Sequence, residues 1–273
     1  MTLKHKRGTN DHGVSESIGF LLIFTIVIMG IGLVTLYGYP MLLQQQTSAD
    51  EQIMEKNMIV LQNDIKSLAY KTVPFKETSL KIGGGSLTVY NSSYTPSSST
   101  IKIYDSGTTY VDLFQPGELR YESVSAQTDI SLQNGAVLLR RHFEPGSVML
   151  AQPRWFYDGP TNTMVINLVN ITSTDLMANA GIGTVKMALG EVYYTKTDIS
   201  AGVPLYLDYT PDTTQDYSVA WDDYIMKTLN NPPAISVSRS GTPGTGSPLT
   251  YTLAGSTLMT LVIKKYEVII KSL

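Results

Sequence analysis

The strongest pattern along the chain is an apolar segment, residues 18–39, that contains no charged side chain. As a helix, its 22 residues rise about 33 Å, which is enough to cross a hydrocarbon core of about 30 Å. The segment is longer than the apolar part of a signal peptide and runs into Pro40 without an Ala-x-Ala cleavage site. The pattern therefore predicts a helix in a membrane or in a filament core, with a kink at Pro40.

A second helical pattern covers residues 42–72, which contain neither glycine nor proline. Its apolar residues form a narrow stripe at alternating steps of four and three, which indicates one face of a helix. The stripe consists of Met54, Met58, Leu61, Ile65 and Leu68. The helix is predicted to end at Val73, because a residue before proline is pushed out of the α region. The stripe packs either on the chain's own β domain or on neighbouring copies.

From residue 79 onward the hydrophobic period changes to two, which is typical of strands. Residues 80–82 and 86–90 flank Gly83-Gly84-Gly85, which predicts a hairpin. Further strands are expected at residues 100–104, 110–114, 119–123, 136–141, 164–170, 183–188, 191–197, 205–209, 249–253 and 258–270. A short helix is expected at residues 222–229 and an exposed, mobile loop at residues 230–248. The fold class is therefore expected to be α+β, with a long helix over residues 14–73 and an antiparallel β-sandwich-like head over residues 79–273.

Charge and composition bear on the location of the chain and on its partners. Lys4, Lys6 and Arg7 precede the apolar segment, whereas the first charged residues after it are acidic. The positive-inside rule then puts the N-terminus in the cytoplasm and the head outside a single-pass membrane anchor. The net charge is −3 and no basic stripe follows the N-terminus, which argues against nucleic acid as a partner. The chain has no cysteine, which excludes disulfides and thiolate metal sites.

The sequence contains none of the common catalytic motifs in a suitable context. No HExxH, P-loop or dinucleotide-binding glycine turn occurs in a suitable context. The histidines are His5, His12 and His142. His142 follows two arginines near a strand end, where a solvent-facing or hydrogen-bonded role is expected rather than that of a base. We therefore predict neither an enzyme nor a cofactor.

Three kinds of residue suggest other chemistry in the head. Asp208, Asp212 and Asp216 recur every four residues and are candidate calcium ligands, although acidic surface turns explain the spacing more simply. Asn91 and Asn170 begin N-glycosylation sequons, and Asn91 is the better placed because a serine-rich turn follows it. An aromatic group is expected to pack across strands, with a sugar- or partner-binding face as the alternative. It consists of Tyr193, Tyr194, Tyr206, Tyr209, Tyr217, Trp221 and Tyr224.

The residues before the apolar segment carry a family resemblance. The stretch from Asp11 to Gly19, with the pattern Val-Ser-x-x-Ile-Gly, resembles the class III signal peptide of archaeal type IV pilins and archaellins. Those proteins have a charged leader that ends in Gly or Ala and is removed by a prepilin peptidase. The resemblance implies a leader over residues 1–13 and a cut between Gly13 and Val14, with a second candidate cut after Gly8.

The resemblance also implies a function and a mode of assembly. It points to an archaeal cell-surface protein with a structural or adhesive role, anchored or polymerised through its N-terminal helix. Gly19, Gly30 and Gly32 allow neighbouring helices to approach closely, and Glu16 is the candidate partner for the free α-amine of a neighbouring Val14. The implied partners are membrane lipid, the peptidase, other copies or other pilins, and a surface ligand that the sequence does not identify. The alternative is a single-pass envelope protein that binds a ligand and never polymerises.

Overall fold

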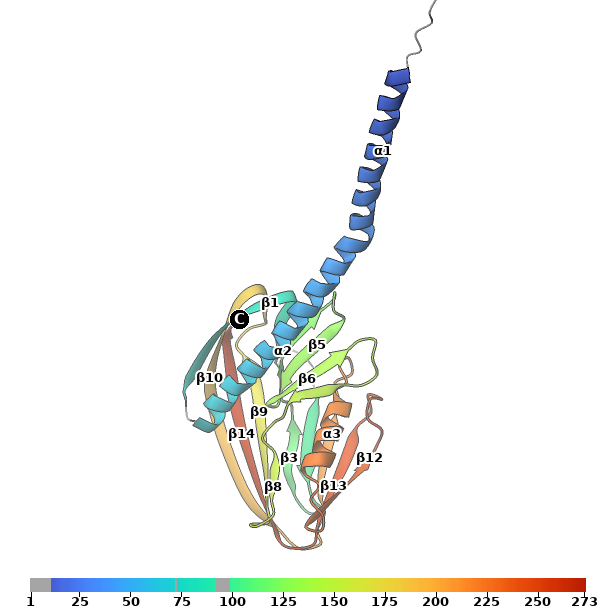
Figure 1. Cartoon of the computed structure of the whole chain (residues 1–273). Coiled ribbons are helices and arrows are strands. Elements are labelled where there is room, and N and C mark those ends of the chain that lie inside the picture. The colour runs from blue at the N-terminus through green and yellow to red at the C-terminus, as the bar shows by residue number, and fades with distance from the viewer. Residues whose placement is uncertain (1–10, 72, 92–98) are drawn as a thin grey trace, which may run out of the picture. The chain divides into compact units, whose positions relative to one another are not determined.

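The computed structural model describes residues 11–71, 73–91 and 99–273, without the side chains of residues 11–16 (Figure 1). Contacts within the chain divide it into two compact units, Met1–Ser48 and Ala49–Leu273. The first unit contains helical backbone over its described part. The second contains the end of the long helix and all of the strands. The fold class is α+β, as the sequence predicts.

The first unit contains α1 (Asp11–Leu33), the π-helix η1 (Val34–Gly38) and the beginning of α2 (Tyr39–Lys71). The hydroxyls of Thr25 and Thr35 donate to the carbonyls four residues earlier, at 2.8 and 2.9 Å. These polar groups of the apolar segment are therefore satisfied within the helix. At η1 the Tyr39 amide donates to the Val34 carbonyl, five residues back. This π turn lies directly before Pro40, where the sequence predicts a kink, and π bulges are one of the causes of helix kinks.

In the second unit, α2 lies on a nine-stranded sheet, which we call sheet A (Figure 1). All five residues of the apolar stripe are at most 1% exposed and contact strands of this sheet. The stripe therefore packs on the chain's own β domain. Gln62, beside the stripe, is 1% exposed, and its side-chain amide donates to the carbonyls of Gly135 and Gln152 at 2.7 and 2.9 Å. These bonds satisfy a buried polar group and fix the helix against the sheet.

Sheet A has the strand order β7-β6-β5-β4-β1-β10-β14-β9-β8. Its strands are β1 (Phe75–Tyr90), β4 (Glu118–Ser123), β5 (Thr128–Gln133), β6 (Ala136–Arg141), β7 (Val148–Ala151), β8 (Phe156–Asp158), β9 (Thr163–Ser173), β10 (Met177–Ile199) and β14 (Met259–Ser272). Neighbours are antiparallel except β14 and β9, which are parallel. Sheet A is thus a mostly antiparallel sheet with one parallel pair.

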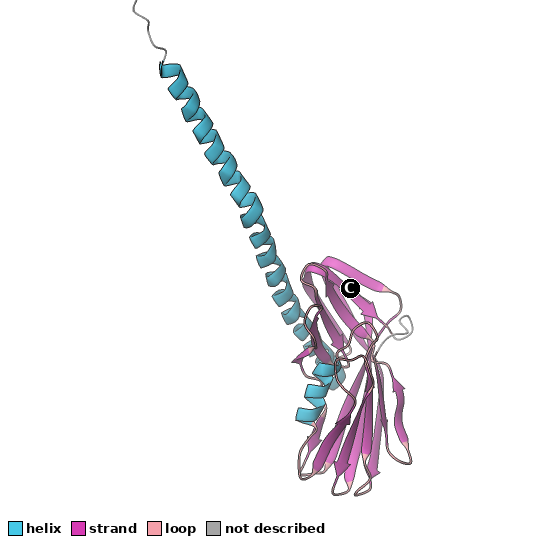
Figure 2. Ribbon diagram, turned by 90° about the vertical axis from the view of Figure 1, so that its right-hand side faces the viewer, coloured by secondary structure: helices cyan, strands magenta, loops and turns pink. Residues whose placement is uncertain are grey.

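A five-stranded sheet, sheet B, has the order β12-β13-β11-β2-β3. Its strands are β2 (Thr100–Tyr104), β3 (Thr109–Phe114), β11 (Leu205–Thr210), β12 (Ile235–Ser240) and β13 (Leu249–Gly255). The helix α3 (Ser218–Thr228) packs beside it and shares its hydrophobic core. Figure 2 shows the strands of both sheets in magenta and the helices in cyan.

Two hydrophobic clusters lie on opposite faces of sheet A. The inter-sheet cluster joins sheet A to sheet B and α3, and the helix-side cluster joins sheet A to α2. On β14, Leu261 and Ile263 belong to the inter-sheet cluster, whereas Val268 and Ile270 belong to the helix-side cluster. Because side chains alternate along a strand, these odd and even residues point to opposite faces. The long strands therefore take part in both cores.

The hairpin predicted at the triple glycine is wrong, because β1 continues through it as one strand with a shift of register between Ile82 and Leu87. A Cβ at Gly83 would lie 2.3 Å from the Asp50 carboxylate of α2, and a Cβ at Gly85 would lie 2.3 Å from the Glu122 carbonyl. Gly84 has a φ of +67°. The glycines therefore permit close approach and a bulge rather than a turn.

Other boundaries also differ from the prediction. The two strands expected at residues 183–188 and 191–197 are parts of one strand, β10. The loop expected at residues 230–248 contains β12, whose side chains alternate between buried and exposed at its start. The strands β5, β7 and β8 were not expected, and α3 begins at Ser218 rather than at residue 222.

Candidate functional site

The apolar segment is the most distinctive surface of the described chain. It belongs to the one helix, among the described residues, that is long and apolar enough to cross a membrane. None of its most apolar stretch is buried. Phe20 and Tyr37 are each 72% exposed. An exposed apolar surface of this extent is unfavourable in water.

The glycines predicted to serve assembly lie within α1. At Gly19, Gly30 and Gly32 a Cβ would meet nothing within 4 Å. The helix surface at these positions is therefore open to a neighbour, and assembly through them stays a prediction. Gly13 and Val14 lie in the first turn of α1, where only the backbone is described. The side chain of Glu16 and residues 1–10 of the leader lie outside the described part.

The three aspartates proposed as calcium candidates do not form one site. Asp208 lies on β11, opposite Lys102 and Thr250. The Asp212 carboxylate accepts hydrogen bonds from the Thr214 and Gln215 amides at 2.6 and 3.2 Å. Asp216 accepts from the Ser218 and Gly246 amides, both at 2.8 Å. Within the described ranges, no group of three or more acidic or histidine side chains is placed to hold a metal ion.

The two sequons differ in access. Asn91 is 6% exposed, and its side-chain nitrogen donates to the Ser173 carbonyl at 3.0 Å. A glycan on that nitrogen would displace this bond. Asn170 is half-buried on β9 and lines a hollow with Tyr193 and Glu267. The geometry thus favours Asn170 over Asn91, and glycosylation itself stays a prediction.

The aromatic group separates into a buried and an exposed set. Tyr209, Tyr217, Trp221 and Tyr224 belong to the inter-sheet cluster, where the Trp155 and Trp221 rings lie 5.3 Å apart. Tyr206 stacks on Tyr104 across two strands at 5.2 Å. These residues have the packing role that the sequence predicts.

Tyr193 and Tyr194 are each 59% exposed on β10. In this part β10 pairs with β14 alone, because β1 pairs with β10 only up to Ala188. The two tyrosines therefore lie on a free edge of sheet A and are available to a partner.

His142 is hydrogen-bonded to two side chains. Its Nε2 lies 2.6 Å from Oδ2 of Asp129, and its Nδ1 lies 3.2 Å from Oε1 of Gln127. Among the described residues, no serine, threonine or lysine nucleophile hydrogen-bonds to this ring. These two contacts hold the end of β6 against β5 and the turn before it.

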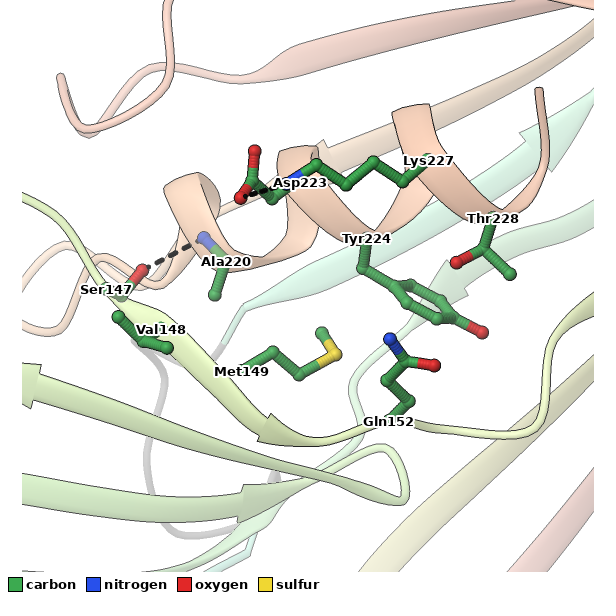
Figure 3. A pocket seen from close by; sticks show the side chains of 9 residues that line it. All are labelled: Ser147, Val148, Met149, Gln152, Ala220, Asp223, Tyr224, Lys227 and Thr228. Atoms are coloured by element: carbon green, nitrogen blue, oxygen red, sulfur yellow. Dashed lines mark hydrogen bonds and ion pairs between the residues drawn. The ribbon is translucent and has the colours of Figure 1, made fainter.

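A pocket of about 210 Å³ lies between α3 and the strand β7 (Figure 3). Several of its polar side chains have partners: Ser147 accepts from the Ala220 amide at 3.1 Å, and Lys227 pairs with Asp223 at 2.9 Å. The Tyr224 hydroxyl donates to the carbonyl of Trp155 at 2.9 Å. Among the residues drawn, Ser147 bonds to Ala220 and Lys227 to Asp223 (Figure 3).

A buried charge network lies on the face of β4 opposite to α2. Arg120, 5% exposed, contacts Glu118 and lies 3.9 Å from Oδ2 of Asp212 and 4.4 Å from the centre of the Tyr90 ring. Glu118 also accepts from the Ser131 hydroxyl. Burial, with the Asp212 carboxylate nearby, raises the pKa of Glu118.

Sequence reasoning missed this network. The alternation Glu118-Leu119-Arg120-Tyr121-Glu122 has the pattern of a strand with one face in water. The loop between β11 and α3, which contains Asp212, covers that face. The contact between Arg120 and Asp212 is visible only in the folded chain, because Arg120 lies in sheet A and Asp212 follows a strand of sheet B.

The fold and these surfaces define a protein with one helix that could span a membrane and a second unit of α+β class. Residues 12–239 match DUF7289, a family of unknown function, and the chain belongs to that family. No curated protein and no solved structure matches it.

Proposed function

We propose that this chain is a pilin-like structural or adhesive protein of the archaeal cell surface, anchored through α1 and displaying the head outside the membrane. The observation that carries the proposal is the contrast along one helix. The apolar segment is exposed throughout, whereas the stripe of α2 is buried on sheet A.

The energetics favour a cover for the apolar segment. Removing one large apolar side chain from water contributes about 1.5–3 kcal/mol. At least ten such side chains in α1, among them Leu21, Ile23 and Ile26, are more than half exposed. Lipid, or a bundle of equivalent helices, provides this cover without a change in the second unit. A secreted protein free in solution would leave it in water.

Orientation follows from the charged flanks. The cations before the apolar segment favour a cytoplasmic N-terminus. The bond between Gly13 and Val14 then lies on the side where a prepilin peptidase would act. Cleavage leaves Val14 with a free α-amine, which is the proposed partner for Glu16 of a neighbouring copy.

Processing tests the proposal most directly. In cells that make the full chain, mass spectrometry of the surface protein is expected to find Val14 at the N-terminus. Gly13→Val is expected to block the cut, whereas the matched change Gly8→Val leaves it intact. A mature protein that begins at Met1 or Thr2 rules out the pilin route.

Polymerisation needs a separate test. Glu16→Gln is expected to abolish filaments while cleavage and membrane insertion stay intact. Glu144→Gln, which changes a carboxylate whose side chain is 67% exposed in the head, is the control and should leave filaments unchanged. If cleaved wild-type protein stays monomeric and its cells carry no filaments, the protein is a single-pass anchor for the head.

A further inference from the structure

The open face of sheet A below the end of α2 is unlike the rest of the surface. Across β10, β14 and β9, Tyr194 lies opposite Lys264, and Lys264 lies opposite Asn167. In the next row Lys196 lies opposite Val262. These residues point away from sheet B, because their neighbours on each strand, such as Ile263 and Ile166, belong to the inter-sheet cluster.

Two adjoining hollows open on this face. One, of about 470 Å³, is lined by Tyr70, Arg154, Phe156, Lys264 and Tyr266 among others. The second, of about 800 Å³, is lined by Tyr70 and Arg154 again and by Lys66, Lys71 and Gln152. The shared residues make the hollows continuous. We call them together the cationic groove, after Lys66, Lys71, Arg154 and Lys264.

The groove has cations without carboxylates. No aspartate or glutamate lines either hollow, and within the described residues none of these four cations belongs to an ion pair. The neighbouring strand β1 differs, because its Lys76 pairs with Asp64 of α2 at 3.5 Å. The net charge of the chain is −3, so this is a local excess of positive charge.

Aromatic rings hold two of the cations in place. The Arg154 guanidinium lies 4.9 Å from the centre of the Tyr70 ring, and the Lys264 ammonium lies 5.7 Å from that of Tyr194. Cation–π contacts of this kind orient a charge without neutralising it. The charges therefore stay available to an anion.

The remaining lining points to a hydroxyl-rich ligand. Asn63, Ser67 and Gln152 are uncharged hydrogen-bonding side chains. The end of α2 at Lys71 adds carbonyl groups that have no partner within the helix, and these accept from hydroxyls. The negative end of a helix dipole disfavours a dense phosphate backbone, which offers acceptors alone. Tyr194, 59% exposed, presents ring surface on which a sugar can stack.

We propose that the cationic groove binds an acidic polysaccharide, a chain of sugars that carry carboxylates. The cations pair with the carboxylates, the uncharged groups and the helix carbonyls bond the hydroxyls, and Tyr194 contacts a sugar face. The continuous hollows suit an extended chain of several sugars. The inference rests on the proposed display of the head, for which it supplies a ligand class.

Binding is measured on the purified full chain in a non-ionic detergent, which makes the result independent of cleavage and filament assembly. The probe is polygalacturonate, and dextran of similar length is the neutral control. We expect polygalacturonate to bind, with an affinity that falls as salt is added, and dextran not to bind. Equal binding of both polymers, or of neither, overturns the proposal.

Lys264 and Lys265 provide a matched pair, because they are neighbours on β14 that point to opposite faces. Lys265 lines a different hollow, with Glu191 and Glu267. Lys264→Gln and Arg154→Gln are each expected to weaken binding about fivefold, as for an exposed ion pair. Lys265→Gln has the same effect on net charge and should leave affinity unchanged. An equal loss in Lys265→Gln refutes a localised groove.

Two further measurements identify the ligand class. Tyr194→Ser is expected to weaken polygalacturonate binding about fivefold, and an unchanged affinity would contradict the stacking contact. Double-stranded DNA and vesicles of phosphatidylglycerol are tested in parallel. Tighter binding of either one than of polygalacturonate overturns the polysaccharide assignment. Unchanged tryptophan fluorescence confirms that each variant is folded.

Discussion

Arg120→Met is expected to destabilise the second unit by about 3–5 kcal/mol, because it leaves two carboxylates buried without their cation. Glu118 and Asp212 are 3% and 6% exposed. Glu122, the third carboxylate in contact, has a side chain that is 36% exposed and adds little. Methionine retains most of the aliphatic volume beside the Tyr90 ring, which keeps the cost of a cavity small. A typical domain is stable by about 5–15 kcal/mol, so the loss is a large fraction of the total.

Thermal or denaturant unfolding of the full chain in detergent measures this loss. The chain has two tryptophans, Trp155 and Trp221, and both are buried in the inter-sheet cluster. Their fluorescence therefore reports on the second unit and not on the apolar segment. A loss of this size corresponds to a fall in Tm of about 6–20 °C for a domain of this length.

The pH dependence of the loss has a defined sign. Burial raises the pKa of Glu118 above its unfolded value of about 4.3. The folded state therefore binds the proton more tightly, and this contribution to stability is lost as pH rises through the folded pKa. Removing the guanidinium raises that pKa further, so Arg120→Met should be less damaging at about pH 5 than at about pH 8.

The control is Arg141→Met, which removes a cation that is 46% exposed beside Glu51. We expect it to cost less than about 1 kcal/mol at either pH. If Arg120→Met costs no more than Arg141→Met, the network is not a buried charge system and the reasoning is refuted.

Three further predictions concern the fold and the anchor. Gly85→Ala should cost about 1–3 kcal/mol, because its Cβ would lie 2.3 Å from the Glu122 carbonyl, whereas Gly107→Ala, with its nearest atom at 3.8 Å, should be within about 0.5 kcal/mol of wild type in the same unfolding assay. Leu61→Ala removes a fully buried side chain of the stripe and should cost about 2–5 kcal/mol. Its neighbour Val60 is 47% exposed, and an equal cost for Val60→Ala would show that the stripe does not pack as described. Ile23→Asp and Ile28→Asp should each oppose membrane insertion by about 2.5–3.5 kcal/mol; fractionation of cells that still finds both variants wholly in the membrane would contradict the anchor.

Sequence pattern predicted the parts of the fold that local physics decides. The stripe from Met54 to Leu68 was recognisable because helical periodicity and a buried face coincide. The strands β2 and β6 matched their expected bounds, β2 because its side chains alternate regularly and β6 because it is a short apolar run that follows the Asn134-Gly135 turn. The triple glycine led to a wrong prediction of a hairpin. The glycines are needed because Asp50 and Tyr121, from distant parts of the chain, approach the backbone there.

The candidate sites also divide into those that local sequence predicts and those that only the folded chain brings together. The apolar segment needed only length and composition. The cationic groove needed the end of α2, the segment at Arg154 and the middle of β14 to come together, and no local pattern relates them. For the same reason the aromatic residues could not be sorted by sequence into the buried Trp221 and the exposed Tyr194.

The sharing of β10 and β14 between two cores has a mechanical consequence. Tension that reaches Ala49 along the helix is resisted first by the stripe of α2 on sheet A. If that contact holds, the load passes into long strands that are also packed against sheet B. Stretching the second unit then requires rows of hydrogen bonds to shear together with both hydrophobic layers, instead of opening one at a time. We therefore expect the second unit to give way in one step rather than strand by strand.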